Sequence, residues 1–499
     1  MFKKILIANR GEIAIRVMRA CKEMDIATVA IFSDIDRSAQ HVSYADEAYH
    51  IGKSPAGESY LSIKKIIDVA LKSHADAVHP GYGFLAENPL FADEVEKHGL
   101  KFIGPDVDTI RLLGDKITAR ELMEKAGVPI VPGIKKPVKN SADAHNSATK
   151  IGYPLLLKAA AGGGGKGMRI VSSKKELDGL FKMAQSEARS AFGDDRIYIE
   201  KYLQNPRHIE IQILADKYGN IIHLGERECS IQRRHQKVIE ESPSPIVDPG
   251  MRQAMGQTAI QAAKASNYIN AGTVEFLVDQ NKQFYFLEVN TRLQVEHPVT
   301  EMVTGIDLVR EQLLIASGEK LSVQQDQIQV NGSAIECRIY AEDPDNNFLP
   351  SSGRIQNYRE PAGPGIRVDS GFTKGDSISI YYDPLIAKLV AWGETRERAI
   401  QRMKRALDEY VITGIKTVIP FLKLVMDHAD FQAGSISTHF IEEQMTRSAA
   451  TTSVADEDLK AMAILSCLVD FQNKNKTKTL QKRIDKQSWK TVNRQFNLQ

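Results

Sequence analysis

The chain has 499 residues, more than one typical hydrophobic core can hold, so two to four domains are expected. Its net charge of +2 provides no overall field that favours nucleic acid or a membrane surface. The four cysteines are widely separated, which argues against structural zinc and a disulfide framework. The first apolar run is too short for a signal peptide and no run is long enough to span a membrane, so a cytoplasmic protein is expected.

The first part of the chain alternates between short apolar runs and helical patterns. Strands are predicted at residues 3–8, 27–32, 77–78 and 101–103, and helices after Gly11 and over about 60–73. A β-α-β alternation predicts a parallel sheet covered by helices. The first turn contains only Gly11 and not GxGxxG, so a dinucleotide site is not supported.

A glycine-rich segment follows a predicted helix at 115–126. Residues 153–158 predict a strand that carries Lys158, Gly162–Gly167 are glycine-rich, and residues 168–171 predict a second strand. Serial glycines suit a mobile flap whose N–H groups approach phosphate oxygens closely. There is no GKS or GKT and no helix follows directly, so this is not a Walker P-loop. The alternative is a flexible surface hairpin.

Residues 226–237 are dense in charged and polar side chains. They follow predicted strands at 197–203 and 208–213. Two interpretations stay open for this segment. It is either a solvated loop, or a cavity wall whose cations bind anionic ligands. The cations concerned are Arg233, Arg234, His235 and Lys237.

The most informative segment runs from the apolar strand Phe284–Leu287 to Glu296. Glu288 and Asn290 are two residues apart, so on a strand they point to the same face and offer hard oxygen ligands for Mg²⁺. Arg292, Gln294 and Glu296 continue this spacing and offer a cation, an amide and a base for a small oxyanion. A hairpin with residues 272–278 would add Glu275. The alternative is a polar strand edge or loop.

The rest of the chain changes character. Residues 334–340 and 365–368 predict strands, residues 399–409 a helix, and residues 458–470 a possible helix. From Asn473 to Gln499 there are eight Lys or Arg residues and one acid. Such a tail is either a solvated, partly disordered segment or a docking segment for a partner protein. One short basic tail is weak evidence for nucleic-acid binding, which is not expected.

Taken together, these motifs resemble the biotin carboxylase family over about residues 1–447. The matching segments are the opening MFKKILIANRGEIA, His79–Asn88, Gly162–Gly167, Glu226–Lys237, Glu288–Glu301 and Glu336–Ile339. The resemblance implies an α/β multidomain fold. Its parts are an N-terminal parallel-sheet domain (1–113), an ATP-grasp domain (114–330) with a glycine-rich lid (about 131–203), a strand-rich C-terminal domain (331–447) and a basic tail (448–499).

The resemblance also implies the chemistry. ATP, bicarbonate and a biotinyl carrier would give ADP, phosphate and the carboxybiotinyl carrier, with Mg²⁺ or Mn²⁺ as the metal. The implied cofactor-binding residues are Lys116, Lys158, Gly162, Gly163, Gly164, Gly165, Lys166, Gly167, Glu200, Lys201, Leu203, His208, Gln232 and His235. The implied metal ligands are Glu275, Glu288 and Asn290. The implied catalytic residues are Glu296 as base, Arg338 as biotin partner, and Lys237, Arg292, Gln294 and Val295 around bicarbonate.

The chain has no Ala-Met-Lys-Met motif to carry biotin itself. A separate biotin-carrying and carboxyltransferase subunit is therefore expected, and the resemblance further implies a homodimer. The extension at 448–499 resembles the stand-alone biotin carboxylase chains of two-subunit pyruvate carboxylases. Acetyl-CoA or propionyl-CoA carboxylase is the alternative complex. Another ATP-grasp ligase, such as a carbamoyl-phosphate-forming enzyme, is a more distant alternative.

Overall fold

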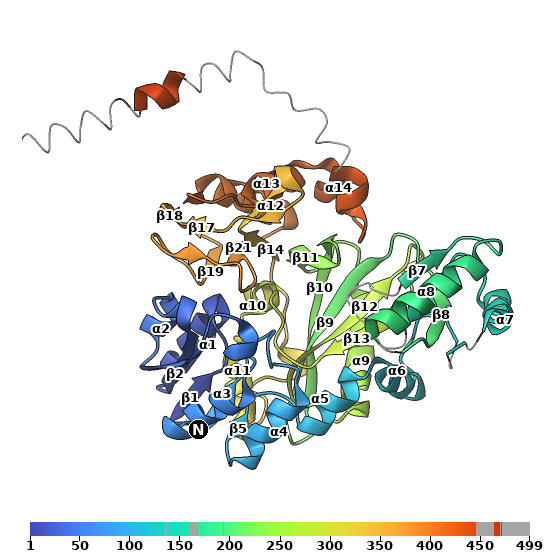
Figure 1. Ribbon diagram of the computed structural model, residues 1–499, viewed down its shortest axis with the longest axis horizontal. Coiled ribbons are helices and arrows are strands. Elements are labelled where there is room, and N and C mark those ends of the chain that lie inside the picture. Colours follow the sequence, from blue (N-terminus) through green and yellow to red (C-terminus); the bar gives the residue numbers. More distant parts are fainter. Residues whose placement is uncertain are drawn as a thin grey trace, which may run out of the picture. The chain divides into compact units, whose positions relative to one another are not determined.

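The structure is a computed structural model that describes residues 1–134, 137–138, 140–159, 168–192, 194–445, 464–469 and 471 (Figure 1). The chain divides into two compact units, Met1–Glu442 and Glu443–Gln499. Apart from residues 464–469, the elements described below lie in the first unit. The predicted lid, Gly162–Gly167, lies outside the described residues, as does most of the basic tail.

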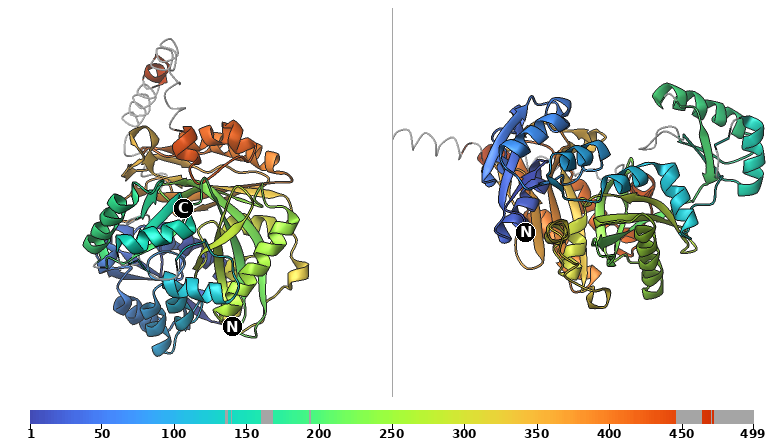
Figure 2. Two further views of the ribbon diagram at one scale, coloured as in Figure 1. Left: turned by 90° about the vertical axis from the view of Figure 1, so that its right-hand side faces the viewer. Right: turned by 90° about the horizontal axis from the view of Figure 1, so that it is seen from below.

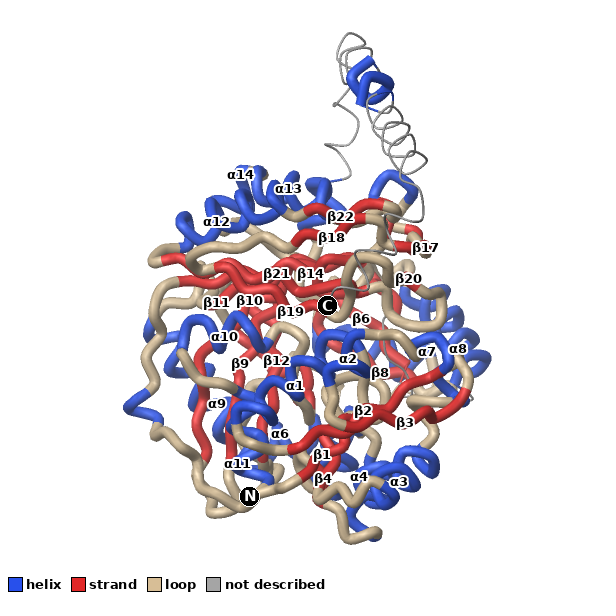
Figure 3. The backbone as a smooth tube through the Cα atoms, turned by 90° about the vertical axis from the view of Figure 1, so that its left-hand side faces the viewer, coloured by secondary structure: helices blue, strands red, loops and turns tan. Residues whose placement is uncertain are grey.

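The N-terminal part is a parallel sheet, as predicted (Figure 3), and it has five strands, one more than expected. Its strand order is β3-β2-β1-β4-β5, with β1 Lys4–Ile7, β2 Ala27–Ser33, β3 Glu47–Gly52, β4 Ala77–His79 and β5 Lys101–Phe102. The accompanying helices are α1 Gly11–Glu23, α2 Gln40–Tyr44, α3 Ile63–Lys72 and α4 Pro89–Lys97. Strand β3 was not predicted, because only Ile51 on it is fully buried and its polar residues hide the pattern.

A small separate layer follows helices α5 Val107–Gly114 and α6 Lys116–Lys125 (Figure 2). It is a three-stranded antiparallel sheet, β7-β6-β8, with β6 Leu155–Ala159, β7 Met168–Val171 and β8 Ile197–Lys201. Helices α7 Ser141–Ile151 and α8 Leu177–Phe192 cover it. Its core contains Leu155, Leu157, Phe181, Ile197 and Ile199. The predicted strands on both sides of the glycine-rich segment are therefore confirmed.

An eight-stranded antiparallel sheet joins the central and C-terminal segments. Its order is β13-β12-β9-β10-β11-β14-β21-β19. The strands are β9 Arg207–Ala215, β10 Ile221–Arg233, β11 Gln236–Ser242, β12 Asn270–Val278, β13 Phe284–Asn290, β14 Ser333–Tyr340, β19 Ile366–Ser370 and β21 Leu385–Gly393. The pairing of β11 with β14 matters most for function, because it places Arg338 in the same sheet as Glu210 and Glu275.

Further helices and short strands complete the central and C-terminal segments. The helices are α9 Pro249–Ala265, α10 His297–Thr304, α11 Leu308–Ala316, α12 Arg396–Glu409, α13 Ile419–Asp427 and α14 Ala429–Gln432. The short strands are β15 Glu342–Asp343, β16 Leu349–Pro350, β17 Gly353–Arg354, β18 Asn357–Arg359, β20 Ser377–Ile378 and β22 Val411–Thr413. Residues 464–469 of the second unit are helical. Among the described residues, no helix has the length and hydropathy of a membrane span.

Two details of the central segment differ from the expectations. The solvated-loop interpretation of residues 226–237 is wrong, because they form most of the hairpin β10–β11, whose turn at Arg234 and His235 has positive φ at both positions. The alternation that places Glu288 and Asn290 on one face of a strand does not continue to residues 292–296, because β13 ends at Asn290. Residues 291–296 form an irregular turn before α10, and side-chain bonds, rather than a strand, bring them together.

Helix α1 packs closely against the C-terminal strands, and Gly371, after β19, marks the contact. A Cβ at Gly371 would lie 2.6 Å from the backbone nitrogen of Glu12 and 2.9 Å from the Cα of Gly11. Gly371→Ala should therefore lower the free energy of unfolding by about 1–3 kcal/mol, as overpacking does. Urea denaturation measures this change.

The control is Gly179→Ala in α8, where a Cβ meets no atom within 4 Å. It should stabilise the helix by about 0.5–1 kcal/mol. If Gly371→Ala is as stable as the parent chain, the close approach of α1 to β19 is contradicted.

Candidate active site

The densest group of buried charges surrounds Lys237 on β11. Its ammonium lies 2.6 Å from Glu210 Oε2, 2.9 Å from Glu275 Oε1 and 2.7 Å from Glu296 Oε1. The three carboxylates come from β9, β12 and the turn before α10. Each of the three is less than 9% exposed. One cation therefore holds together three anions from three separate segments.

The sheet register explains why these side chains meet. Glu210 lies opposite Glu275 on one side and opposite Arg227 on the other, and Glu275 lies opposite Glu288. Residues directly opposite each other on paired strands share a face of the sheet. A row of four charged residues therefore crosses β13, β12, β9 and β10, and Lys237 reaches this row from β11.

Arg227 is the residue that sequence analysis missed here. It is fully buried and donates to Glu210 (2.5 Å), Gln212 (2.8 Å), Thr300 (2.9 Å) and Thr273 (3.0 Å). Four of its five N–H donors are used in this way, which makes the buried guanidinium tolerable. The clean alternation of β9 and the density of arginines after Glu226 were signals that could have identified it.

Arg292 and Gln294 lie in the irregular turn after β13. Arg292 Nε donates to Glu87 Oε2 at 3.0 Å, and Arg292 Nη1 donates to Gln294 Oε1 at 3.0 Å. Gln294 in turn donates to Glu275 Oε1 at 3.2 Å. Glu87 also accepts from the Thr291 backbone N–H at 3.1 Å. Glu87 belongs to the N-terminal motif His79–Asn88, so this motif holds the turn that carries Arg292.

Glu296 also connects Lys237 to Arg338 on β14. Arg338 Nη2 lies 3.0 Å from Glu296 Oε2, and Arg338 Nε donates to Glu240 Oε1 at 2.6 Å. Glu240 was not predicted. The direct pairing of Arg338 with Glu296 places the expected biotin partner beside the expected base, although 42 residues separate them in sequence.

Burial and neighbouring charges shift the pKa values of the residues in this cluster in opposite directions. Burial raises the pKa of Glu296, but Lys237, Arg338 and Arg227 outweigh it and hold the pKa well below its ordinary value. Burial lowers the pKa of Lys237, but its three carboxylate neighbours raise it well above its ordinary value. Burial raises the pKa of Glu240 to about 7 despite Arg338. Glu296 is thus ionised and able to accept a proton, but it is a weak base while both cations bind it.

The residues expected at the nucleotide come from helix α6, the small three-stranded sheet and the large sheet. Lys116, at the start of α6, pairs with Glu288 at 3.1 Å, and Lys158 on β6 pairs with Glu200 at 2.6 Å. Arg120, which was not predicted, also binds Glu200 at 2.9 Å. The remaining predicted residues with described positions are Lys201 at the end of β8, Leu203 just after it, His208 hydrogen-bonded to Gln232 at 2.7 Å, and His235 exposed in the β10–β11 turn.

Glu275, Glu288 and Asn290 suit a hard divalent cation by their donor chemistry. Glu275 and Glu288 lie opposite each other on paired strands, and Asn290 contacts Glu275 at 2.8 Å. His208, Glu210 and Glu275 also offer ligand atoms within 4.8 Å of one another. Carboxylate and amide oxygens are the ligands that Mg²⁺ prefers. Lys237 already binds Glu210 and Glu275, and Lys116 binds Glu288, so a metal ion would have to replace a lysine in either set.

Comparison with known proteins decides the family. Family models match residues 1–110 (biotin carboxylase, N-terminal domain), 115–324 (carbamoyl-phosphate synthase L chain, ATP binding domain) and 336–443 (biotin carboxylase C-terminal domain). The chain belongs to the biotin carboxylase family. The biotin carboxylase of Nostoc sp. is 56% identical over 442 residues, which are 89% of this chain and 99% of that one. The pyruvate carboxylase A chain of Methanothermobacter thermautotrophicus is 56% identical over 443 residues, 89% and 90% of the two chains.

Solved structures of biotin carboxylases agree with this fold. A Campylobacter jejuni biotin carboxylase, described as a β,γ-ATP complex, has a TM-score of 0.85 and 50% identity over 89% of this chain and 99% of that one. The biotin carboxylase domain dimer of Hydrogenobacter thermophilus 2-oxoglutarate carboxylase, with MgADP and bicarbonate, has a TM-score of 0.84 and 52% identity over 89% and 98%. The predicted α/β multidomain fold and family resemblance are confirmed.

The stability of a Lys237→Met variant, compared with that of the parent chain at several pH values, should show that Lys237 balances the charge of the cluster. Glu275 and Glu296 have lowered pKa values, so they contribute stability above their unfolded pKa that is lost as pH falls. Without Lys237 this contribution disappears, and the buried carboxylates destabilise the fold by about 3–5 kcal/mol at neutral pH. The difference in melting temperature between the parent chain and the variant should therefore be largest near pH 7–8 and shrink toward pH 4.

Thermal melts across this pH range provide the measurement, with Lys374→Met as the control because Lys374 is exposed. A difference that is constant with pH would contradict the assignment of Lys237 as the shared counter-ion.

Proposed function

We propose that this biotin carboxylase transfers a carboxyl group from bicarbonate to biotin on a separate carrier protein, at the expense of ATP. The observation that carries the proposal is the chain of contacts Lys237–Glu296–Arg338, which joins an anion-binding cation, a base and a guanidinium within one buried cluster. The flanking matches to both biotin carboxylase domains support this reaction over that of another ATP-grasp ligase.

The first step requires bicarbonate to become a nucleophile. Lys237 and Arg292 bind the anion, with Gln294 and the Val295 backbone beside it, and Glu296 removes its proton. The carbonate oxygen then attacks the γ-phosphorus of ATP, so that a P–O bond forms, the bond to ADP breaks, and carboxyphosphate results. Phosphoryl transfer depends on position and charge neutralisation, which Lys116 and Lys158 supply. Mg²⁺, held by Glu275, Glu288 and Asn290, would neutralise phosphate charge when bound.

Proton removal from bicarbonate becomes possible when the ion-pair partner of Lys237 changes from Glu296 to the substrate anion. Glu296 is a weak base while Lys237 and Arg338 bind it. An anion that takes Lys237 from Glu296 weakens one of these two contacts and raises the pKa of the carboxylate. The base thus becomes stronger when its substrate is in place. Carboxyphosphate decomposes in water, so the site has to exclude water during the transfer.

The second step transfers the carboxyl group. Carboxyphosphate breaks into CO₂ and phosphate, phosphate takes the ureido proton of biotin, and the resulting enolate attacks CO₂. Arg338 stabilises the enolate oxygen, because a guanidinium is fixed, planar and always charged. Its position on β14, paired to β11, keeps it beside the bicarbonate pocket through both steps.

The proposal places biotin and the carboxyltransferase on another protein of the complex. It is supported by the Nostoc biotin carboxylase, 99% of which aligns with this chain. We favour the complex of a two-subunit pyruvate carboxylase. The aligned region covers 90% of the pyruvate carboxylase A chain of M. thermautotrophicus but 99% of the Nostoc biotin carboxylase, so the former extends beyond the family core, as this chain does. The proposal includes a homodimer and a cytoplasmic location.

A second candidate complex is an acyl-CoA carboxylase. The propionyl-CoA carboxylase alpha chain of Ruegeria pomeroyi aligns with 93% of this chain at 50% identity. Co-purification of the native partner, followed by assays with pyruvate, acetyl-CoA and propionyl-CoA, separates the candidates. Carboxylation of pyruvate alone supports the first proposal, and carboxylation of an acyl-CoA alone contradicts it.

Glu296→Gln tests the base. The amide keeps the shape of the side chain but accepts no proton, so carboxylation of free biotin should fall by about 10²–10⁴, the usual span for a general base. Nucleotide binding, measured by calorimetry, should persist. Glu397→Gln, on the exposed face of α12, is the control. Near-normal turnover in Glu296→Gln would remove this residue from the mechanism.

Arg338→Lys tests the biotin step. Arg338→Ala would leave Glu240 and Glu296 short of a cation, whereas lysine keeps the charge and loses the planar fork. Phosphate release and fixation of ¹⁴C into carboxybiotin are measured on one preparation. Bicarbonate-dependent phosphate release should be retained and carboxybiotin formation lost. A parallel fall of both would show that Arg338 serves bicarbonate or the fold instead of the enolate.

A further inference from the structure

A second row of charged side chains crosses the C-terminal half of the large sheet. Arg338 of β14 lies opposite Lys388 of β21, and Lys388 lies opposite Asp369 of β19. Because directly opposite residues share a face of a sheet, these three side chains lie next to one another. One end of the row touches the site, since Arg338 binds Glu296 at 3.0 Å.

Lys388 is fully buried, at 0% exposure, although it is a lysine. Its ammonium donates to the Val295 carbonyl at 3.0 Å and lies 3.3 Å from Glu12 Oε2 and 3.9 Å from Asp369 Oδ2. The Tyr82 ring lies 5.7 Å away. An ammonium without access to water is costly to bury unless oxygen atoms surround it. Two carboxylates provide the charge balance, so the Val295 carbonyl is the neutral partner whose position Lys388 fixes.

The Val295 carbonyl belongs to the peptide unit that enters Glu296. This unit is planar, so fixing the carbonyl also fixes the backbone N–H and the Cα of Glu296, the atom that bears its side chain. Residues 291–296 lie outside any strand and have no ladder of hydrogen bonds to hold them. The side chains of Gln294 and Glu296 reach the sheet through Glu275, Lys237 and Arg338. Lys388 ties the backbone of the turn to the sheet.

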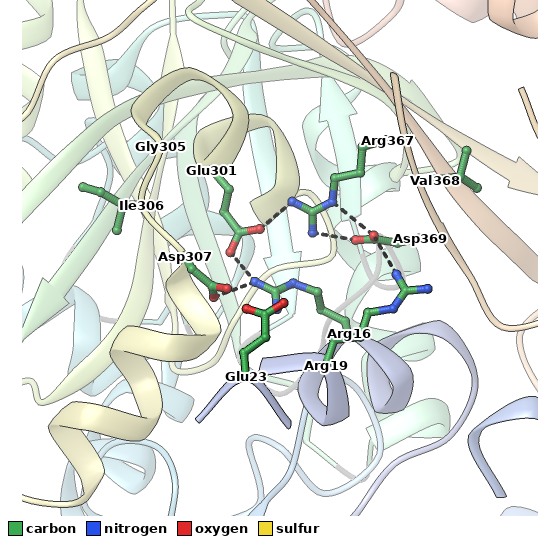
Figure 4. Close-up of a pocket in the computed structure, with 10 residues that line it drawn as sticks. All are labelled: Arg16, Arg19, Glu23, Glu301, Gly305, Ile306, Asp307, Arg367, Val368 and Asp369. Atoms are coloured by element: carbon green, nitrogen blue, oxygen red, sulfur yellow. Dashed lines mark hydrogen bonds and ion pairs between the residues drawn. The ribbon is translucent and has the colours of Figure 1, made fainter. Parts of the chain in front are cut away.

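A second tie holds the helix that begins after Glu296. Arg367 of β19 pairs with Asp369 at 2.8 Å and with Glu301 of α10 at 2.7 Å. Arg16 of α1 pairs with Glu301 from the other side at 2.9 Å. Figure 4 shows these residues converging on a pocket of about 340 Å³. Asp369 is therefore shared between the lysine that holds the turn and the arginine that holds α10.

We propose that Lys388 is a positioning residue for the general base: its bond to the Val295 carbonyl, anchored by Glu12 and Asp369, fixes Glu296 between Lys237 and Arg338. The inference rests on the biotin carboxylase activity and adds a residue that does not touch the substrates. A displaced base slows proton removal from bicarbonate while the nucleotide contacts of Lys116 and Lys158 stay in place. The effect should therefore fall on bicarbonate turnover and spare ATP affinity.

The test compares Lys388→Met with the double variant Lys388→Met/Glu12→Gln in the full-length protein. The single variant leaves Glu12 without its counter-ion. The double variant removes that charge, while Asp369 keeps Arg367. Bicarbonate-dependent ATP cleavage is measured with both substrates varied, together with thermal melts. Lys374→Met, an exposed lysine between β19 and β20, is the matched control.

The proposal predicts that kcat falls about 10²-fold in both variants, the scale of a small misplacement of a reacting group. The KM for ATP should stay unchanged, and the melting temperature should recover in the double variant. Recovery of kcat together with the melting temperature would overturn the proposal, because Lys388 would then act only on stability. A parallel rise of the KM for ATP would also overturn it. If the parent chain shows no bicarbonate-dependent cleavage, the proposed function fails instead.

Discussion

The structure of the site depends on one constraint: a buried charge must have a partner of opposite sign. Lys237 meets this constraint for three carboxylates at once, and they meet it for Lys237. Continuum arguments make each of these ions costly to bury alone, so the group is stable only as a set. The antiparallel sheet supplies the set, because its register lines up Glu275, Glu210 and Arg227 on neighbouring strands.

The same constraint connects structure with catalysis. The charges of the site are already balanced, so an incoming anion must replace an existing partner. Bicarbonate binding at Lys237 would release Glu296 from one of its two cations and thereby raise its basicity. Binding of bicarbonate would then activate the base that removes its proton. Charged residues farther from the reacting groups also hold the site in place. Lys388 links the turn before α10 to β21, and Arg367 links α10 to β19.

Much of this arrangement could be predicted from sequence, and the reasons for success and failure are physical. Short apolar runs identified the parallel sheet and the hairpin of β12 with β13, and the family motifs pointed to Lys237, Glu296 and Arg338. The polar hairpin β10–β11 was not recognised as a pair of strands, because its inward face is itself charged and so lacks the usual alternation. Arg227 and Lys388 escaped notice because their burial comes from non-local pairing. The predicted site roles and domain boundaries remain predictions.

The central claim is that the cluster around Lys237 makes bicarbonate attack ATP, and the fate of oxygen tests it most directly. Attack by a bicarbonate oxygen on the γ-phosphorus leaves that oxygen in the phosphate product. The purified chain, supplied with ATP, Mg²⁺, free biotin and ¹⁸O-labelled bicarbonate, should release phosphate that carries one labelled oxygen, as read by mass spectrometry. Unlabelled phosphate formed alongside carboxybiotin would contradict the account, because bicarbonate would then not be the nucleophile.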